Sequence, residues 1–414
     1  MVEKSIIHKL VKLWVVKLLP DEHIFSSSTP SSNIRKWILH PVKRRLAKYY
    51  LVILRQLNHL KVIAITGSAG KTTTKEMIAS ILKREGRVVA SYKNIDPVYN
   101  IPDTILKCGI NTKYLVLEMG VEYKGEMDFY LWLAKPDISV ITNIYPTHTL
   151  FFGNEEGVFA EKKKITACLG RDDWAILNLE NKYLKSLKNK LSCKIWGFGG
   201  LSEHQAENVS ISLKGTKFIY FNKDTKYKLN IDLPLAGDHF AMNALASIGV
   251  SEILNINKEY IVKGLRDFAL PENRMRIVQH KSGALIVDDS YNSNPAAAKK
   301  ALANFNDISK GYKKIVVFGD MLELGKLDNK LHRELGIYMR KLKIDDLITV
   351  GKTSKTTGEN FKNDSKSSES KHFDEWENAS KYVKKFLKSG NAILIKGSRS
   401  INLDKLTQNL LKLQ

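Results

Sequence analysis

The chain has 414 residues, with 66 Lys and Arg against 43 Asp and Glu, which gives a formal net charge of +23. This length predicts two or three domains, and 43% hydrophobic residues is typical of globular proteins. The charge attracts polyanions of any kind. No RNA-binding or zinc-finger pattern accompanies it, so no nucleic-acid partner is expected. The three cysteines form no Cys-x-x-Cys pair, which argues against a zinc ribbon or a disulfide framework and fits a reducing cytosol.

Residues 1–58 are predicted to form a basic, amphipathic helical extension. The first 60 residues contain 11 Lys and Arg but only 3 Asp and Glu. In Ser5–Leu19 the lysines fall in one sector of a helix, and Trp14 and most aliphatic side chains lie outside it. Val42–Leu60 repeats this character, and Ser26–Ser32 predicts a linker between the two segments.

Two interpretations of Ser5–Leu19 stay open. No apolar run in it reaches the ~18 residues that a transmembrane helix needs, and no small-residue cleavage site of a signal peptide follows it. A basic amphipathic helix can lie in the membrane interface, which would give peripheral membrane contact through residues 5–19. The helix can equally pack on the body of the protein with its lysines in water.

The most informative motif is Thr66-Gly-Ser-Ala-Gly-Lys-Thr72, which follows the apolar run Val62–Ile65 and precedes a helix-forming stretch. This order predicts a strand, a phosphate-binding loop and a helix N-terminus, where backbone N–H groups and the helix dipole favour an anion. Lys71 supplies a positive charge to the β- and γ-phosphates, and the Thr72 hydroxyl can ligate magnesium. A nucleoside triphosphate is therefore expected to contact Gly67, Ser68, Ala69, Gly70, Lys71, Thr72 and Thr73.

Short apolar runs alternate with helical patterns after Lys61, which predicts an α/β fold with a parallel sheet covered by helices. Residues 59–270 are expected to form the central, nucleotide-binding domain, with a more β-like stretch over 194–233. Its strands are expected at Val62–Ile65, Arg87–Ala90, Tyr114–Glu118, Ile138–Thr142 and Trp174–Leu177, and its helices at Thr72–Arg84, Glu126–Ala134, Glu155–Leu169 and Ala241–Leu254.

The same alternation restarts near Pro271, so residues 271–414 are expected to form a second, Rossmann-like domain. Asn363–Lys371 is rich in Ser and Lys and predicts a mobile loop. The expected strands are Ala284–Asp288, Lys314–Phe318, Leu347–Val350 and Ala392–Lys396, and the expected helices are Pro295–Phe305, Lys330–Leu342, Glu375–Leu387 and Leu403–Leu413.

Polar residues follow the strands of the central domain. Glu118 ends an apolar strand before Gly120, at the edge of the sheet where ligands of α/β proteins usually bind, which favours a binding-site role over a helix cap. His148 closes Thr142-Asn-Ile-Tyr-Pro-Thr-His148. Lys162 follows Gly157 by five residues, but it also heads a run of three lysines, and such runs are normally solvated helix faces.

The phosphate loop is shorter than the usual G-x-x-x-x-G-K-[ST], because the fifth residue before Gly70 is Ile65 rather than glycine. Its T-G-x-x-G-K-T spacing resembles that of the Mur ligases, most of all the MurF type. The resemblance runs from Lys61 to the C-terminus, through motifs at 142–148, 152–162, 235–244, 286–295, 318–325 and 394–399. It implies an ATP-dependent amide ligase, in which ATP phosphorylates a carboxylate and an amine then attacks the acyl phosphate.

The resemblance also implies a set of cofactors and catalytic residues. Two Mg²⁺ ions are expected, and one lysine is expected to bind CO₂ as a carbamate, which turns a cation into an oxygen ligand. Spacing from Gly157 selects Lys162 for this role over Lys163 and Lys164. The implied metal ligands are Thr72, Glu118, His148 and Lys162, and the implied catalytic residues are Lys71, His148, Lys162 and Arg274.

Three further positions are implied as nucleotide contacts. Asn243 would approach the adenine, although a packing role beside His239 on the same helix face competes with it. Arg274 lies at the junction of the two domains and would reach the ATP phosphates when they close, with Arg276 as the alternative. Asp289 at a strand end suits a ribose hydroxyl.

The substrate side departs from the MurF pattern. Asn94 opens the segment expected to bind substrate, but Asp96, Pro97 and Asn100 replace the residues usual there, which leaves the acceptor open. The other implied substrate contacts are Asn292, Asn294, Lys396, Ser398 and Arg399. MurF enzymes carry an N-terminal domain for the UDP-sugar of their substrate, and the basic extension is too short and too helical to be that domain.

The main hypothesis is a cytoplasmic, monomeric ligase that adds D-Ala-D-Ala to a muramoyl-peptide precursor of the cell wall. A second is a Mur-like ligase with another amino acid or a different, for example lipid-linked, acceptor, acting peripherally at the inner face of the membrane. Folylpolyglutamate synthesis is disfavoured by the sequence at Gly70–Thr72. A third hypothesis is a nucleotide-dependent protein of the membrane surface without ligase activity.

Overall fold

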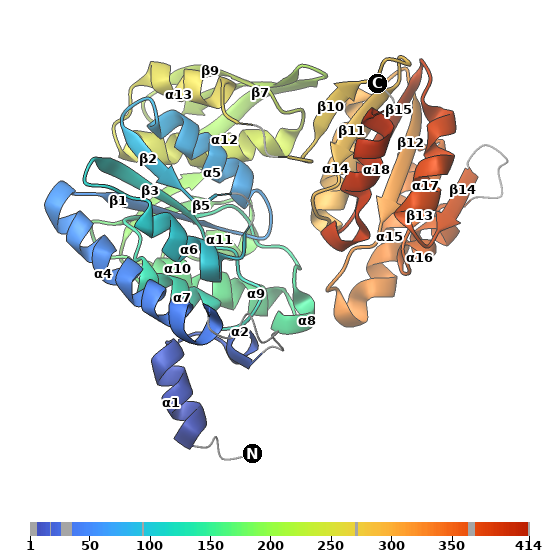
Figure 1. Cartoon of the computed structure of the whole chain (residues 1–414). Helices are drawn as coiled ribbons and strands as arrows, with labels where there is room; N and C mark the ends of the chain where they lie inside the picture. Colours follow the sequence, from blue (N-terminus) through green and yellow to red (C-terminus); the bar gives the residue numbers. More distant parts are fainter. Residues whose placement is uncertain are drawn as a thin grey trace.

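The computed structural model describes residues 6–16, 18–25, 35–92, 95–269, 272–362 and 369–412. Two α/β units lie side by side, and a group of N-terminal helices lies at one end of the first unit (Figure 1). One sheet has nine strands and the other has six. The α/β fold class expected from the sequence is confirmed.

The nine-stranded sheet forms the core of the central unit. Its strands are β1 (Lys61–Thr66), β2 (Arg87–Ala90), β3 (Thr112–Glu118), β4 (Ile138–Ile141), β5 (Trp174–Asn178), β6 (Lys194–Phe198), β7 (His204–Ser212), β8 (Gly215–Asn222) and β9 (Lys228–Leu233). Their order is β2-β3-β1-β4-β5-β6-β7-β8-β9. Pairing is parallel from β2 to β7 and antiparallel from β7 to β9. The segments that follow β1, β3 and β4 therefore meet at one edge of the sheet.

Side chains of β1 point alternately into two cores. Ile63 and Ile65 pack with α5 (Lys71–Leu82), α12 (Asp238–Ile253) and α13 (Lys258–Arg266). Val62 and Ala64 pack on the other face with α4 (His40–Asn58), α6 (Pro97–Leu106) and α7 (Glu126–Leu133). Burial on both faces explains why this strand is a continuous apolar run. Shorter helices of the central unit are α8 (Thr149–Phe152), α9 (Glu155–Lys162), α10 (Lys164–Ala167) and α11 (Lys182–Lys185).

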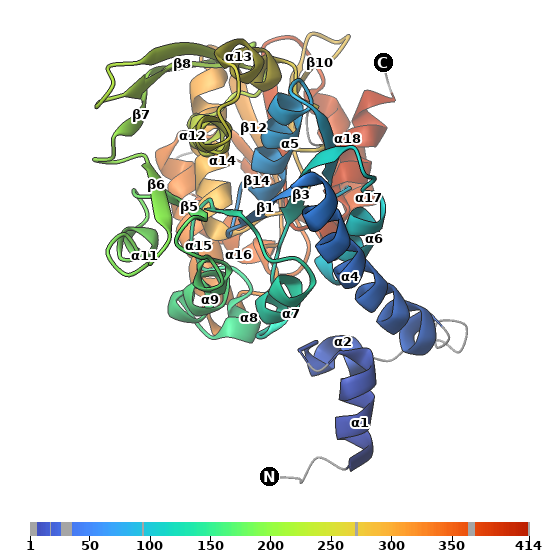
Figure 2. The same ribbon diagram turned by 90° about the vertical axis from the view of Figure 1, so that its left-hand side faces the viewer.

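The N-terminal extension is helical, as its sequence predicts. α1 (Ile6–Val15), α2 (Asp21–Phe25) and a π-helix, η1 (Arg35–Leu39), precede α4, and α1 lies beyond the end of α4 (Figure 2). α4 packs on α6 and α7 through Ala47, Leu51 and Leu54. Within the residues described, no helix is long and apolar enough to cross a membrane. The predicted linker Ser26–Ser32 lies outside the described residues.

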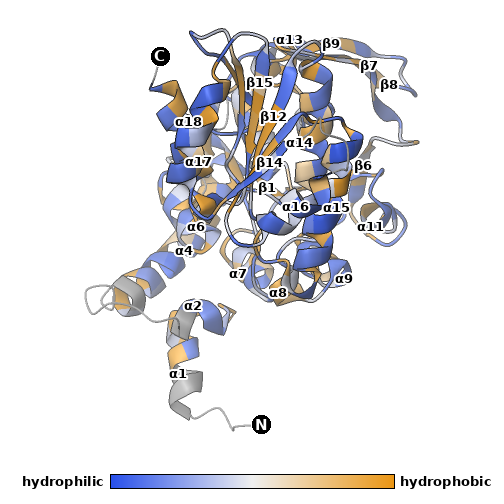
Figure 3. Cartoon of the chain, turned by 90° about the vertical axis from the view of Figure 1, so that its right-hand side faces the viewer, coloured by the Kyte–Doolittle hydropathy of each residue, from blue (hydrophilic) through white to orange (hydrophobic). Residues whose placement is uncertain are grey.

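The six-stranded sheet forms the second unit. Its strands are β10 (Arg276–Gln279), β11 (Leu285–Asp289), β12 (Lys313–Gly319), β13 (Asp346–Val350), β14 (Glu369–Phe373) and β15 (Asn391–Lys396). They are ordered β10-β11-β15-β12-β13-β14, and only β10 is antiparallel to its neighbour. The apolar strands β12 and β15 lie in the middle (Figure 3). The helices are α14 (Pro295–Ile308), η2 (Gly325–Leu327), α15 (Asp328–Lys341), α16 (Ser354–Phe361), α17 (Trp376–Val383), η3 (Lys384–Phe386), η4 (Arg399–Ile401) and α18 (Leu403–Leu411).

Three expectations about local structure need correction. The predicted loop Asn363–Lys371 is wrong at its end, because Glu369–Phe373 forms β14, a polar edge strand held by backbone pairing with β13. Residues 363–368 lie outside the described part. The helix expected over Glu155–Leu169 is two helices that meet at Lys163. The segment expected to be a substrate loop contains α6, whose start is capped by the Asp96 side chain with Pro97 in the first turn.

Close packing of α13 on α5 generates a prediction about stability. A Cβ atom added at Gly264 would lie 2.6 Å from the Cα of Ile81 and 2.7 Å from its Cγ1. We expect Gly264→Ala to lower the free energy of unfolding by about 1–3 kcal/mol in urea denaturation, because the helices must separate. Gly170→Ala is the control, since its Cβ would meet only Asp173 at 3.5 Å. Equal effects of the two substitutions would contradict this packing argument.

Candidate active site

The phosphate loop is held against the segment that follows β4. The backbone N–H of Ser68 donates to the carbonyl of Asn143 at 3.0 Å, and that of Ala69 donates to the Asn143 side chain at 2.8 Å. Both glycines of the loop have positive φ, 144° at Gly67 and 81° at Gly70. A Cβ at Gly67 would lie 2.0 Å from the Thr142 hydroxyl. Only glycine fits this close approach, and at Gly67 no side chain covers the backbone of the loop.

The Glu118 carboxylate has one oxygen that fits a magnesium ion. The Thr72 hydroxyl donates to its Oε1 at 3.0 Å. Its Oε2 is buried and has no hydrogen-bond partner among the residues that the structure describes. A buried carboxylate oxygen without a donor is costly, and hard oxygen atoms are the ligands that Mg²⁺ prefers. These two side chains therefore fit the predicted metal.

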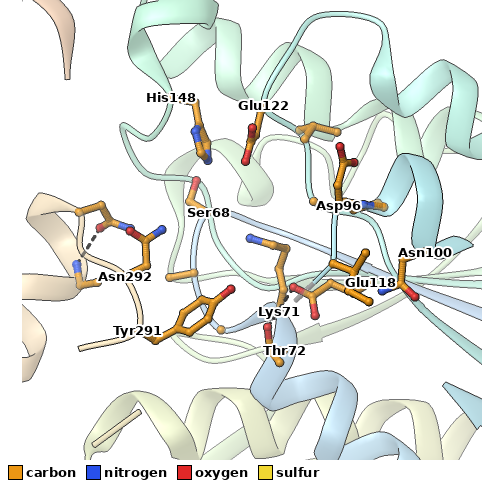
Figure 4. A pocket seen from close by; sticks show the side chains of 18 of the residues that line it. Ser68, Lys71, Thr72, Asp96, Asn100, Glu118, Glu122, His148, Tyr291 and Asn292 are labelled. Carbon is orange, nitrogen blue, oxygen red and sulfur yellow. Dashed lines mark hydrogen bonds between the residues drawn. The ribbon is translucent and has the colours of Figure 1, made fainter. Parts of the chain in front are cut away.

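A cavity lies between the phosphate loop, the end of β3 and the second unit (Figure 4). Lys71 begins α5 and points into the middle of this cavity. Its ammonium donates to the carbonyl of Gly67 at 2.9 Å. Burial lowers the pKa of Lys71, against the opposing charge of Glu118. An anionic ligand in the loop would supply the charge that this buried cation lacks.

The three lysines that end α9 and start α10 differ sharply in their surroundings. The Lys162 side chain is buried, with 1% exposed. Burial lowers the pKa of Lys162 well below its usual range, and the charge of Lys71 lowers it further. Lys163 is exposed, and Lys164 pairs with Asp128 at 2.7 Å and with Glu161 at 2.8 Å. Of the three, Lys162 is thus the one whose surroundings favour the neutral amine, the form that reacts with CO₂.

His148 joins the two units. Its Nδ1 is in contact with Oε2 of Glu323, which comes from the second unit. The hydrogen bond to His148 lowers the pKa of Glu323. The carbonyl of Glu323 also accepts from the N–H of Leu150 at 3.3 Å. Glu122 lies beside His148 in the cavity, and burial raises its pKa (Figure 4). Among the described residues no group of three or more His, Cys, Asp or Glu side chains could by itself hold a metal.

Arg274 extends from the second unit to the phosphate loop. Its Nη2 donates to the Thr72 hydroxyl at 3.5 Å, and its guanidinium lies 4.5 Å from the ring centroid of Tyr291. Tyr291 and Asn292 face the cavity from the second unit (Figure 4). Asn294 caps α14 by accepting the N–H of Ala297 at 2.9 Å. Arg274 rather than Arg276 therefore reaches the phosphate loop.

Asp289 and Lys396 form a buried pair on neighbouring strands. The Lys396 ammonium lies 2.6 Å from Oδ2 of Asp289 and 3.0 Å from the carbonyl oxygen of Asn292. The other oxygen of Asp289 accepts the N–H of Met275 at 3.2 Å. Both oxygens of Asp289 are thus already engaged within the second unit, and its contact with a ribose stays a prediction.

Two adjoining cavities collect most of the predicted residues. The larger, of about 300 Å³, is lined by Ser68, Ala69, Gly70, Lys71, Thr72, Glu118, His148, Arg274, Asn292 and Asn294. The smaller, of about 120 Å³, is lined by Ala69, Gly70, Thr73, Asn243, Arg274, Asp289, Asn292 and Lys396. The predicted residues that line neither are Gly67, Lys162, Ser398 and Arg399. Asn94 lies outside the described residues.

Two of these four residues support others. The Ser398 hydroxyl accepts the N–H of Leu322 at 3.0 Å. The Arg399 guanidinium donates to the Tyr291 hydroxyl at 3.2 Å. Ser398 and Arg399 therefore stabilise segments of the second unit, and Tyr291, the partner of Arg399, lines both cavities.

The larger cavity also contains acidic residues to which the sequence analysis gave no role. Asp96, Glu122 and Glu126 line it together with Glu118. Glu122 and Glu126 follow the strand-end segment Glu118–Gly120, and this position could have marked them. The contact of Glu323 with His148 joins positions 175 residues apart and has no local signal in the sequence.

Comparisons with known proteins agree with this geometry. Residues 65–251 match the Mur ligase middle domain, and residues 273–399 match the Mur ligase, glutamate ligase domain. The UDP-N-acetylmuramoyl-tripeptide–D-alanyl-D-alanine ligase of Bacillus subtilis is 34% identical over 372 residues, which are 89% of this chain and 79% of that protein. This chain belongs to the Mur ligase family. It is therefore an ATP-dependent, ADP-forming ligase, and the family uses Mg²⁺.

Other Mur ligases show the same relationship. The Escherichia coli protein of the same name is 30% identical over 305 residues, 73% of this chain and 67% of that protein. The crystal structure of MurF from Acinetobacter baumannii superimposes with a TM-score of 0.81 at 27% identity, covering 90% of this chain and 80% of that one. MurF from Thermotoga maritima in complex with ADP has the same fold, with a TM-score of 0.78 at 23% identity and coverage of 90% and 83%.

The buried pair of this Mur ligase generates a second prediction. The Lys396 side chain is 2% exposed and that of Asp289 is 15% exposed. We expect Lys396→Met to lower the free energy of unfolding by about 3–5 kcal/mol, because it leaves a mostly buried carboxylate without its cation. Adding Asp289→Asn should recover part of this loss. The control is Lys388→Met, which changes an exposed lysine. If the changes in free energy of unfolding of the two single variants simply add in the double variant, as measured by urea denaturation, the pair is not coupled.

Proposed function

We propose that this Mur ligase joins the amine of D-Ala-D-Ala to the terminal carboxylate of a muramoyl tripeptide. The observation that carries the proposal is the convergence, in one cavity, of the phosphate loop, the Glu118 carboxylate and Arg274 from the second unit. The relatives described above carry the name of this activity. We further propose that the enzyme acts as a monomer on the cytoplasmic side of the membrane.

The reaction proceeds by two substitutions. An oxygen of the acceptor carboxylate bonds to the γ-phosphorus of ATP as its bond to the bridging oxygen breaks, and ADP leaves. The dipeptide nitrogen then bonds to the acyl carbon, the acyl C–O bond breaks, phosphate leaves, and the nitrogen loses a proton. Catalysis of such a transfer is mainly positioning and charge stabilisation. Lys71 and Arg274 neutralise the phosphate oxygens, and the loop Gly67–Thr73 supplies its backbone N–H groups.

The residues proposed to hold magnesium come from the central unit. Thr72 and Glu118 would hold one ion, and His148 together with a carbamate on Lys162 would hold a second. Magnesium neutralises charge on the transferring phosphate. The unpartnered Oε2 of Glu118 and the burial of Lys162, which lowers the pKa of its amine, support these assignments. His148 would exchange its contact with Glu323 for this role.

The remaining proposed contacts surround the nucleotide and the incoming amine. Asn243 and Asp289 line the smaller cavity, which we assign to the adenine and ribose. Asn292 and Asn294 line the larger cavity, which we assign to the reacting groups. We assign Asn94, Lys396, Ser398 and Arg399 to the substrate side, the last three by supporting the elements that carry Tyr291 and Asn292.

The first test is the dependence of ADP release on both substrates. The protein is incubated with ATP, Mg²⁺, bicarbonate and D-Ala-D-Ala or single amino acids, with UDP-linked or lipid-linked muramoyl tripeptide, and mass spectrometry identifies the product. We expect the amide to form, and ADP to appear only when acceptor and amine are both present. Lys71→Ala should abolish the product, whereas the exposed Lys83→Ala should not. ADP release without any amide would instead indicate a nucleotide-dependent protein without ligase activity.

The second test addresses the carbamate. Lys162→Ala should lower kcat by about 10²-fold or more, because one metal ligand is lost. Short carboxylates such as acetate should restore part of this activity by occupying the vacated space. Lys163→Ala, an exposed neighbour, should retain the wild-type rate. A fully active Lys162→Ala variant would contradict the carbamate assignment while leaving the ligase activity itself intact.

A further inference from the structure

The side of α4 that points away from the sheet is apolar. We call Val42, Leu46, Tyr49, Ile53 and Leu57 the outer face of α4; they are between 49% and 66% exposed. At 100° per residue these five positions fall within a sector of about 80°, over a length of about 22 Å. The opposite side of the same helix is buried against α6 and α7. The helix is therefore apolar on both sides, and only one side has a partner within the described chain.

The outer face of α4 continues onto the residues around α1. Leu13, Trp14 and Leu18 are between 41% and 65% exposed. Arg45, on the rim of the outer face, donates to the carbonyl of Leu13 at 2.8 Å, and its guanidinium lies 5.4 Å from the Trp14 ring centroid. Of the twenty large hydrophobic residues that are exposed in the described part of the chain, eleven lie between Leu13 and Leu57. Exposed apolar side chains among these residues are thus concentrated on the N-terminal helices.

The charged residues of the segment that forms this surface are all basic. Residues 35–60 contain seven Lys and Arg and no Asp or Glu. Lys43 and Arg45 flank the outer face on its two sides, and Lys48 lies next to Arg45. Lys43 pairs with Asp103, Arg55 pairs with Asp137, and Arg44 is buried. Among the described residues the Arg45 guanidinium bonds to carbonyl groups, and the Lys48 ammonium lies over the Trp132 ring at 4.2 Å. Arg45 and Lys48 thus carry positive charge beside the outer face without an acidic partner among the described residues.

We propose that the outer face of α4 and the adjoining residues of α1 bind an anionic lipid surface. An exposed apolar stripe flanked by Lys and Arg, with Trp and Tyr among the exposed rings, is the pattern of a helix that lies in the membrane interface. Acidic headgroups supply the charge that residues 35–60 lack. A second copy of the chain fits less well, because two such helices would bring Arg45 and Lys48 against the same cations, and residues 35–60 offer no Asp or Glu to pair with them.

This inference goes beyond the proposed function and does not depend on it, because lipid binding needs neither nucleotide nor acceptor. It also differs from peripheral contact through residues 5–19 alone, since α4 supplies the longer apolar stripe. α4 lies at the margin of the central unit and the second unit lies on the far side of that unit (Figure 1). A lipid surface bound to α4 would therefore lie away from the two cavities, which are lined by residues of both units.

The experiment is flotation of the full chain with vesicles at physiological salt. We expect binding to vesicles of phosphatidylcholine with phosphatidylglycerol, and at least about tenfold weaker binding to phosphatidylcholine alone. Leu46→Glu with Ile53→Glu should weaken binding to the anionic vesicles by about tenfold or more. The control is Leu201→Glu with Leu213→Glu, which makes the same change at exposed leucines far from α4 and should bind like the wild type. Circular dichroism and ligase activity check that both variants fold.

A second pair of variants tests the charge. Lys43→Gln with Lys48→Gln should lower binding to anionic vesicles several-fold, whereas Lys182→Gln with Lys310→Gln, which changes net charge equally, should have a smaller effect. No binding of the wild type, or equal binding by the Leu46→Glu, Ile53→Glu variant, would overturn the proposal. So would a dimer that this variant converts to a monomer in sedimentation, because α4 would then face a second copy.

Discussion

The proximity of two lysine ammonium groups is the constraint around which the central unit of this Mur ligase is arranged. Lys162 is buried, Lys71 is half-buried in the cavity wall, and the charge of Lys71 lowers the pKa of Lys162. Two like charges in a poorly solvated site are unfavourable, so one of them must be neutral or be compensated. The carboxylates Glu118, Glu122 and Glu126 compensate in part, and phosphate would do so for Lys71. Conversion of Lys162 into a carbamate would remove the conflict, because a cation would become an anion beside Lys71.

The second unit completes the site instead of merely covering it. Arg274 reaches Thr72, and Glu323 contacts His148, so two residues of the second unit contact residues that line the larger cavity. Neither contact is extensive. Other contacts also join the units: the Lys300 ammonium donates to Asp238 at 3.1 Å, and the Asn304 side chain lies 3.0 Å from Nδ1 of His239. A ligand that bridges the phosphate loop and Arg274 would add a contact between the units beside the reacting groups.

The sequence was informative where one local pattern determined the structure. The run Val62–Ile65 had to be a strand buried on both faces, and the glycines after it had to leave backbone free for an anion. β14 was missed because its residues are polar and only backbone pairing makes it a strand. α6 was missed although Asp96 and Pro97 form an ordinary helix start. The choice of Lys162 over its neighbours rested on spacing, and its burial is a tertiary property that no local pattern contains.

The contact of His23 with Glu126 ties the N-terminal helices to the chemistry of the central unit. Nε2 of His23 in α2 lies 2.5 Å from Oε1 of Glu126. Oε2 of Glu126 accepts the backbone N–H groups of Glu122 and Tyr123. Glu126 thereby fixes the turn that carries Glu122 into the larger cavity. The extension therefore supports one wall of the larger cavity, and a displacement of the N-terminal helices would be transmitted through His23 and Glu126 to Glu122.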